Sequence, residues 1–296
     1  MICDYEGSDY QSRFWKNADR AYEDAVERVA IRRLLPQSGR RIVEFGAGFG
    51  RLAELYTGYE QIVLLDYSRS LLEEGMQKWG GDPRFTFVAA DIYNLPFAPG
   101  VLSAATMVRV IHHIADVPAA LRRIRESLAP GSTFVLEFAN KRNLKAIARR
   151  ALGRQSWSPF APEPVEFVAL NFDFHPRWML EQVQAAGFDV QRKLSASYLR
   201  IARLKRLLPL KTMVAVDAAL QRTAGLGLYS PSVFLELRVR GDAPADQSAL
   251  GGDAVFRSPR SGLPLRRDGD ALICDGDGTR WLARGNFYDF KDPLAA

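Results

Sequence analysis

Two carboxylates lie where an apolar run gives way to a turn, and both positions suit a nucleoside-like ligand. Glu44 lies two residues before the glycine-rich turn 46–50, which follows an apolar run ending at Phe45. Glycines let the backbone turn sharply and leave room for a ligand beside it. Asp66 ends a second apolar run, 61–65, and a carboxylate there can accept hydrogen bonds from both hydroxyls of a ribose.

The glycine spacing argues against a dinucleotide. A dinucleotide fold rests its pyrophosphate on a Gly-x-Gly-x-x-Gly turn, whereas Gly46, Gly48 and Gly50 have the spacing Gly-x-Gly-x-Gly. Glu44 would repel a pyrophosphate, but it suits a cofactor that carries a cationic amino-acid group. Asp66 does not discriminate, because an NAD enzyme uses the same device. An NAD(P)-dependent oxidoreductase is therefore the disfavoured alternative.

Ionisable side chains gather again after another apolar run. Residues 102–110 lead into Arg109, His112 and His113, and Asp116 follows as a candidate helix N-cap. A histidine titrates near neutral pH and could act as a general base toward a hydroxyl or a ring carbon acid. The alternative is a structural role or a place at the rim of the site. His112 and His113 are the candidate catalytic residues.

Alternating strand-like and helix-like segments must position these residues. Five apolar runs indicate buried strands, at 42–45, 61–65, 84–89, 102–110 and 132–138. The turn at 46–50 is expected to open a helix, and further helices are expected at 70–78 and 117–128. This alternation predicts a doubly wound α/β fold with a mostly parallel sheet, and the ligand site at the switch point after the first strand.

Length and composition are those of a soluble globular protein. The 296 residues suffice for one large domain plus a small one, and 47% of them are hydrophobic and 25% charged. The sequence contains no membrane-spanning run and no signal-peptide pattern. Cys3 and Cys274 do not make a disulfide framework. The expected location is cytoplasmic.

The net charge of +6 is unevenly distributed. Residues 139–240 carry 17 Lys and Arg against 7 Asp and Glu, whereas the rest of the chain carries 23 against 27. The basic stretch fits an acidic acceptor, RNA or an anionic membrane surface, and it equally fits a solvated face.

Four ordered motifs resemble those of the class I S-adenosylmethionine-dependent methyltransferases. They are Glu44 to Gly50, Asp66, Asp91-Ile92 and Arg109 to His113, within residues 41–138. In that family the acid after the third strand accepts from the adenine amino group, and the next backbone N–H donates to the ring. The resemblance implies S-adenosyl-L-methionine as cofactor, with contacts from Glu44, Gly46, Ala47, Gly48, Asp66, Tyr67, Asp91, Ile92 and Arg109.

Beyond residue 138 the resemblance is architectural. The family has seven strands, and the sixth and the antiparallel seventh are expected at 188–194 and 233–240. The intervening segments 139–175 and 195–231 are longer than a minimal fold needs, and such inserts cover the open end of the sheet and choose the acceptor. The methyltransferase domain would span 1–240. Its N-terminal helix, with Tyr10 and Phe14, would either cover the cofactor as a lid or simply pack on the domain.

Both inserts contain basic amphipathic pieces, at 141–152 and 199–208. Such a helix can lie on a membrane surface, or it can be a cap helix with solvated lysines. The first insert also carries five aromatic residues, which either line an apolar acceptor pocket or form the insert's own small core: Phe160, Phe167, Phe172, Phe174 and Trp178.

The C-terminal segment resembles the small zinc-ribbon-like proteins that partner methyltransferases. A polar linker at 241–253 is followed by a β-rich module at 254–296. The positions of the two Cys-x-x-Cys pairs hold Ser258, Ser261, Cys274 and Asp277. One Cys and one Asp do not hold structural zinc, so the sequence predicts no metal site and a ribbon that docks on the main domain.

The sequence therefore predicts a methyltransferase that acts on a small-molecule or lipid-like acceptor by in-line displacement. An RNA methyltransferase is an alternative within the same class, because the basic middle and the ribbon module both fit RNA. A non-catalytic binding protein that keeps the fold is the alternative outside it. No obligatory protein partner is evident in the sequence.

Overall fold

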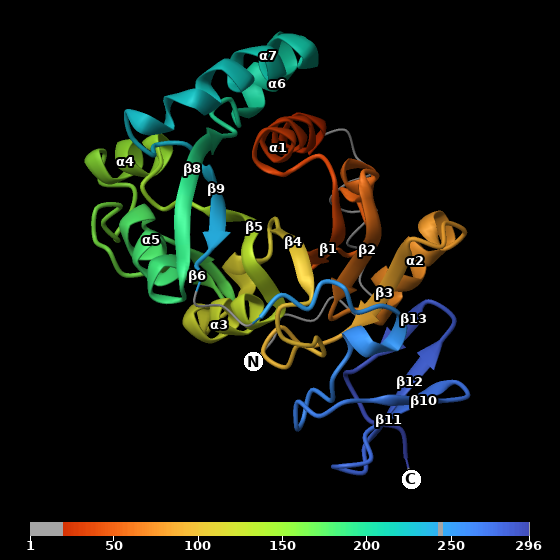
Figure 1. The fold of residues 1–296 in the computed structure, drawn as a ribbon. Coiled ribbons are helices and arrows are strands. Elements are labelled where there is room, and N and C mark those ends of the chain that lie inside the picture. Colours follow the sequence, from red (N-terminus) through yellow and green to blue (C-terminus); the bar gives the residue numbers. More distant parts are fainter. Residues whose placement is uncertain (1–19, 242–244, 296) are drawn as a thin grey trace.

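The computed structural model describes residues 20–241 and 245–295, which are built around one twisted β-sheet (Figure 1). The middle of the sheet has seven strands in the order β3 (Phe85–Ala89), β2 (Tyr59–Asp66), β1 (Gly39–Phe45), β4 (Leu102–Met107), β5 (Leu128–Ala139), β9 (Ser232–Val239) and β8 (Phe188–Ala196). Only β9 is antiparallel to its neighbours in this part of the sheet. The predicted doubly wound fold with an antiparallel seventh strand is confirmed.

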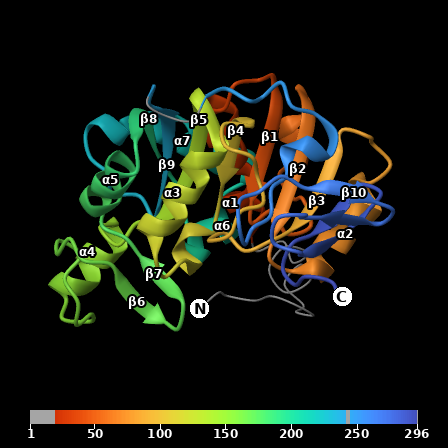
Figure 2. The ribbon, with the colours of Figure 1, turned by 60° about the horizontal axis from the view of Figure 1, so that its bottom comes forward.

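Helices cover both faces of the sheet (Figure 2). One apolar cluster joins the sheet to α1 (Ala21–Leu34) and α2 (Arg69–Trp79), and the other joins it to α3 (Val117–Ser127) and α5 (Pro176–Ala185). Tyr10 and Phe14, predicted either to cover the cofactor or to pack on the domain, lie outside the described part of the chain. Within the described residues, no helix combines the length and apolarity that crossing a bilayer requires.

The cap predicted at Asp116 is present, but the helix predicted after the glycine turn is not. Ser68 Oγ accepts from the Leu71 N–H at 3.4 Å, and Asp116 Oδ1 accepts from the Ala119 N–H at 3.0 Å. The helix expected after the glycine turn is only a short 3₁₀ segment, η3 (Ala53–Tyr56). The chain has too few residues there for a full helix, because β2 begins at residue 59.

Both inserts leave the sheet at its carboxyl edge. The first contains α4 (Leu144–Ala151) and the hairpin of β6 (Val165–Val168) and β7 (Asn171–Asp173). The second contains α6 (Ala202–Leu207), α7 (Leu210–Leu220) and the 3₁₀ segment η5 (Gln221–Gly225). Since β5 and β8 are both antiparallel to β9, they run in the same direction and deliver both inserts to one edge of the sheet.

The C-terminal segment continues the sheet beyond β3. Its strands are β10 (Arg266–Asp268), β11 (Ala271–Ile273), β12 (Arg280–Arg284) and β13 (Phe287–Asp289), and β13 pairs in parallel with β3. Phe256 lies between Phe97 of the main domain and Tyr288. Part of the predicted linker is bonded to the main domain, because the Gln247 N–H donates to the carbonyl of Gly100, in the turn before β4, at 3.0 Å. The predicted seven-stranded sheet thus extends to eleven strands.

A buried carboxylate ties α1 to the carboxyl edge of the sheet. Glu27 is fully buried, and it accepts from Arg109 Nε at 2.7 Å and from Arg51 Nη2 at 2.9 Å. Burial raises the pKa of Glu27, but the two guanidinium groups outweigh burial and hold that pKa below its usual value. Arg51 follows the glycine turn and Arg109 follows β4, so one side chain joins three segments.

Replacing Glu27 should therefore cost much of the stability. Glu27→Gln leaves two arginines in a buried site without their carboxylate, and breaking such a pair costs about 3–5 kcal/mol. We expect that loss in urea unfolding at neutral pH. Because the folded pKa is lowered, the gap from wild type should be full above the unfolded pKa and shrink as the pH falls through the folded pKa.

Glu181→Gln is the matched control, because Glu181 pairs with Arg177 on the exposed side of α5. An exposed pair contributes about 0–1 kcal/mol. Equal losses in the two variants would contradict the role given to Glu27.

Candidate functional site

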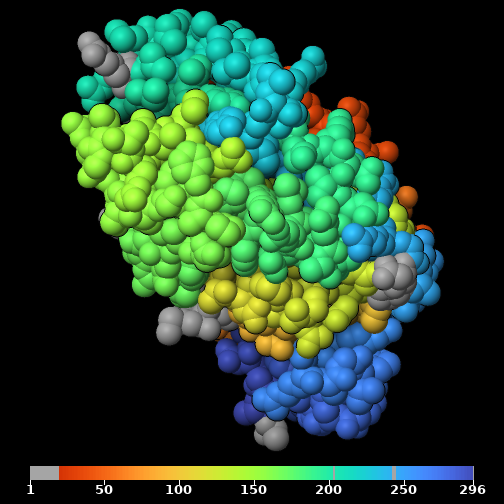
Figure 3. Space-filling model, turned by 90° about the vertical axis from the view of Figure 1, so that its left-hand side faces the viewer, coloured from red at the N-terminus to blue at the C-terminus, as the bar shows by residue number. Residues whose placement is uncertain are grey.

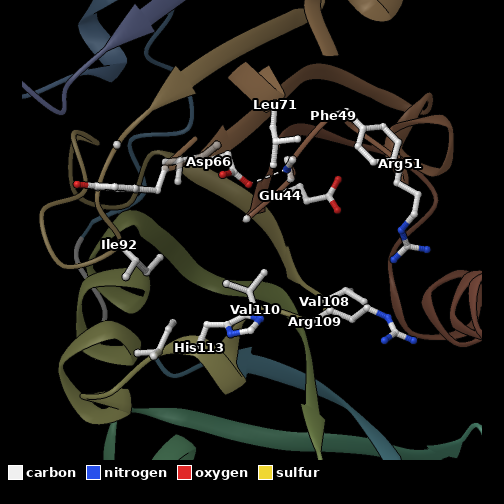
Figure 4. A pocket seen from close by; sticks show the side chains of 17 residues that line it. Glu44, Phe49, Arg51, Asp66, Leu71, Ile92, Val108, Arg109, Val110 and His113 are labelled. Atoms are coloured by element: carbon white, nitrogen blue, oxygen red, sulfur yellow. Dashed lines mark hydrogen bonds between the residues drawn. The ribbon is translucent and has the colours of Figure 1, made fainter. Parts of the chain in front are cut away.

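A cavity opens at the carboxyl edge of the sheet, where the strand order reverses between β1 and β4. Its volume is about 980 Å³, counted with the open space at its mouth. Figure 4 shows side chains from the end of β1, the glycine turn, the end of β2 and the loop after β4 around it. This is the switch point at which doubly wound folds bind ligands.

The glycine turn lies against the end of β2. The N–H groups of Gly46 and Ala47 both donate to the Leu65 carbonyl, at 2.8 and 2.9 Å. Gly46 has φ +71°, and a Cβ atom there would lie 2.2 Å from Val110 Cγ2. Only glycine therefore lets the turn pack against the loop after β4, and this contact shapes one wall of the cavity.

Asp66 is held firmly at the cavity wall. Its Oδ2 accepts from the Gly48 N–H at 2.7 Å, and its Oδ1 accepts from the Ser68 N–H at 2.9 Å. Burial raises the pKa of Asp66 in spite of these bonds. Each carboxylate oxygen has a further lone pair, so Asp66 can still accept hydrogen bonds from a ligand.

Glu44 carries a buried carboxyl group with a strongly raised pKa. It is 4% exposed and lines the cavity, and no hydrogen-bond partner for its Oε2 atom is present among the described residues. Burial raises the pKa of Glu44 to about 8, although nearby Arg51 favours the charged form. A buried acceptor without a partner is costly, and a cationic ligand group would satisfy it.

Arg109 lines the cavity in a strained conformation. Its φ of +61° lies in the left-handed region, which costs a non-glycine residue about 1–2 kcal/mol. Its N–H donates to Glu137 Oε2 at 2.9 Å, and its guanidinium pairs with Glu27. These bonds fix the loop after β4, which contributes Val108, Val110 and His113 to the cavity.

The two histidines have different places. His113 lines the cavity, and its Nδ1 lies 3.0 Å from the Leu170 carbonyl oxygen in the first insert. A carbonyl only accepts, so Nδ1 carries the proton and Nε2 is the basic nitrogen. His112 lies behind His113, with ring centroids 4.1 Å apart, and does not line the cavity. Burial lowers the pKa of both, so both are neutral at pH 7.

Of the remaining predicted cofactor residues, two line the cavity and one does not. Tyr67 and Ile92 line the cavity, but Asp91 does not. Asp91 Oδ1 accepts from the Tyr93 N–H at 2.9 Å and Oδ2 accepts from Asn94 Nδ2 at 3.0 Å, so its side chain closes a local turn. Lys291 of the C-terminal segment lies over the Tyr67 ring, with its Nζ 3.8 Å from the ring centroid.

Several cavity residues have no signal in the sequence that marks them. The unpredicted lining side chains are Phe49, Arg51, Leu65, Leu71, Ala90, Val108, Val110 and Ile114. Most are apolar and look like core residues, and only Arg51 stands out, by its place next to the turn.

None of the five aromatic residues of the first insert lines the cavity. Phe174 is buried and stacks on Trp178 with centroids 5.3 Å apart, whereas Phe160 and Phe167 are exposed. This stack is part of the main apolar core and not a separate core of the insert, so neither predicted alternative describes it.

The four positions that resemble zinc ligands form a hydrogen-bonded cluster. Ser258 Oγ donates to Asp277 Oδ2 at 2.6 Å, Ser261 Oγ donates to the same carboxylate, and the Thr279 N–H donates to Oδ1 at 2.9 Å. Cys274 is a buried thiol, with its Sγ 3.7 Å from Ser261 Oγ. Across residues 20–241 and 245–295, no three His, Cys, Asp or Glu side chains are grouped to hold a metal ion.

Burial raises the pKa of Asp277, but the hydroxyl groups of Ser258, Ser261 and Thr279 outweigh it and hold that pKa well below its usual range. The carboxylate is therefore the charged centre around which these side chains are arranged.

The part of the sequence that forms the cavity matches a known protein family. Residues 43–136, which include all the lining residues, match the family "Methyltransferase domain". A demethylmenaquinone methyltransferase from Clavibacter sepedonicus is 31% identical over 182 residues, or 60% of this chain and 71% of that protein. A 2-phytyl-1,4-naphtoquinone methyltransferase from Nostoc punctiforme is 30% identical over 198 residues, or 61% of this chain and 80% of that protein.

Solved structures share the fold. An S-adenosylmethionine-dependent methyltransferase from Mesorhizobium loti superposes with a TM-score of 0.55 at 22% identity, covering 73% of this chain and 99% of that one. The fold, the family match and the two sequence relatives agree with the motifs around the cavity. The chain belongs to the class I S-adenosylmethionine-dependent methyltransferases.

Proposed function

We propose that this protein transfers a methyl group to a small, lipid-like acceptor with an aromatic or quinol ring. The observation that carries the proposal is the cavity itself, where Glu44 and Asp66 lie on one side and His113 lies across from them among apolar side chains (Figure 4). The two sequence relatives are named for quinone-type acceptors, which supports this acceptor class.

The polar side of the cavity fits S-adenosyl-L-methionine. The buried Oε2 of Glu44 has the charge and position to take the cofactor's ammonium group, and Asp66 has lone pairs for its ribose hydroxyls. Tyr67 and Ile92 would flank the adenine, and Arg109 would lie near the methionine end. Asp91 would act through the turn that carries Ile92. When bound, the cofactor supplies an electrophilic methyl group.

Binding of the cofactor should depend on pH through Glu44. Since the pKa of Glu44 is about 8 without ligand, the carboxyl is mostly protonated at about pH 6.5 and must ionise to meet an ammonium group. We expect the Kd for S-adenosylhomocysteine to fall about tenfold from about pH 6.5 to about pH 8, because the ionised fraction of Glu44 rises by about that factor over this range. Calorimetric titration measures it.

Glu44→Gln removes the titrating group at nearly constant volume. It should bind more weakly at the higher pH and show a flat profile. A wild-type profile that is already flat, with the same Kd in the variant, would rule out this role for Glu44.

The apolar side of the cavity offers one candidate base. His113 is neutral, and its bond to the Leu170 carbonyl makes Nε2 the nitrogen that can take a proton. The same bond holds the hairpin of the first insert against the site. We propose His113 as the group that accepts a proton from the acceptor, with His112 as the side chain packed behind it. Positioning alone could also serve many methyl transfers.

The test uses labelled methyl transfer by the full chain. Reduced demethylmenaquinone, the same ring without its tail, and total RNA are offered separately with methyl-labelled S-adenosylmethionine. We expect label in the tailed quinol, and a fall in kcat of about 10²-fold or more in His113→Ala, as general-base loss predicts. Cofactor affinity should not change.

His175→Asn is the control, because His175 caps α5 away from the cavity and Asn keeps a capping side chain. Label in RNA alone would overturn the acceptor class. An unchanged kcat in His113→Ala would refute the proposed role of His113 as a base, without affecting the proposed acceptor class.

We also propose that the C-terminal segment is a ribbon that needs no metal. Asp277 and the hydroxyl groups around it supply polar contacts at the positions where a zinc ribbon has its ligands. The sheet pairing of β13 with β3 then supplies the docking that a module of this size needs.

A further inference from the structure

Exposed apolar side chains are concentrated on the two inserts. Of the thirteen large hydrophobic side chains that are exposed in residues 20–241 and 245–295, eleven lie between 144 and 226. Three of them occur together at the turn between α6 and α7, where Leu207, Leu208 and Leu210 are 69%, 40% and 45% exposed. Clustered exposure of this kind marks a contact surface more often than scattered single residues do.

This leucine tip, residues 207–210, projects from a firmly attached base. Two residues separate α6 from α7, so the helices form a tight hairpin. At its base Met213 is buried, and Asp217 Oδ2 accepts from Tyr22 of α1 at 2.6 Å. Figure 1 shows α6 and α7 at the top of the molecule, at the opposite end from β10–β13. Figure 3 shows the same segment, in teal, forming the upper end of the surface.

Two exposed basic side chains flank the leucine tip. Exposed Arg206 and Lys211 flank it directly, and neither makes an ion pair within the described residues. Residues 199–222 carry six Lys and Arg against one acidic residue, Asp217. Two of the six, Arg200 and Lys205, pair with Glu23 of α1. Asp217 is buried and bonded to Tyr22, so it does not offset the surface charge.

The exposed leucines and the basic side chains beside them together favour one kind of partner. RNA would satisfy the basic side chains but would leave the leucines in water. A protein groove would accept the leucines, but the two basic residues that flank the tip would then need acidic partners at the edge of the groove. An anionic lipid bilayer satisfies both, because acyl chains receive the leucines while headgroups meet the charges around them.

We propose that the leucine tip inserts into the surface of an anionic lipid bilayer and anchors the methyltransferase there. The hairpin is attached to α1 through Lys205 and Glu23, whose Nζ and Oε1 are 2.7 Å apart. Glu27 of α1 in turn pairs with Arg51 and Arg109, which both line the cavity. Docking would therefore bring the cavity close to the membrane. The lipid-like acceptor of the proposed function would be reached from that membrane, but the bilayer contact itself does not depend on methyl transfer.

Co-sedimentation with vesicles tests the contact without cofactor or acceptor. The full chain is mixed with phosphatidylcholine vesicles, with or without phosphatidylglycerol. We expect binding to the anionic vesicles about tenfold tighter than to the neutral ones, and weaker as salt rises. Replacing the tip leucines together (Leu207→Ser, Leu208→Ser and Leu210→Ser) should weaken that binding about tenfold. The charge variant Arg206→Glu with Lys211→Glu should lose the preference for anionic lipid.

The control variant is Leu263→Ser with Leu294→Ser, because these leucines are also exposed but lie in the C-terminal segment. Failure of the wild type to bind either vesicle, or equal losses in the tip and control variants, would overturn the proposal. The proposal would also be overturned if the protein bound RNA in place of vesicles. In that case the charge variant should lose RNA binding, and the leucine variant should keep it. Cofactor titration without vesicles separates any failure here from failure of the proposed function.

Discussion

A carboxylate buried between two arginines is the interaction on which the site depends. Glu27 has no access to water, so its charge persists only because Arg51 and Arg109 face it. These arginines belong to the glycine turn and to the loop after β4, the two segments that form the cavity. The same loop holds Arg109 in a left-handed conformation, which the ion pair and Glu137 together enforce. Without α1 in place, both walls of the site would lose their support.

The same burial that makes this contact necessary gives the cavity its selectivity. Glu44 lies where water cannot solvate it well, and its raised pKa shows how weakly the empty site stabilises its charge. A ligand that brings a cation to that position recovers the missing interaction, whereas a pyrophosphate would face repulsion. Asp66, already held by two backbone N–H groups, needs no rearrangement to accept further hydrogen bonds. Charge and pre-organisation thus favour an amino-acid-bearing nucleoside over a dinucleotide.

Local sequence predicted the parts of the site that adjacent residues build. Glu44 and Asp66 lie at the ends of β1 and β2, and the glycine turn and His113 come after β1 and β4. Strand order therefore brings them to one edge of the sheet. The sequence could not show Glu27 between two arginines, because that contact joins residues far apart along the chain. Asp91 was assigned to the adenine by resemblance, and the sequence did not show that its carboxylate also closes a turn with Tyr93 and Asn94. Short polar side chains often satisfy nearby backbone groups in this way.

The C-terminal segment shows the same limit at the level of the fold. Its resemblance to a zinc ribbon predicted β-structure, and its small size predicted docking, but neither specifies which edge of the sheet receives it. The parallel pairing of β13 with β3 and the Lys291 contact on Tyr67 arise only in three dimensions. They bring the last strands of the chain next to the cofactor cavity, although that cavity is formed by residues 44–114.

The most direct test of this account is a calorimetric comparison of S-adenosylmethionine, S-adenosylhomocysteine and NADH, with wild-type protein and with Asp66→Ala. The account predicts micromolar binding of the first two ligands to wild type, weak or absent binding of NADH, and loss of the tight binding in the variant. A folded protein that binds neither adenosyl ligand, or that prefers NADH, would contradict it.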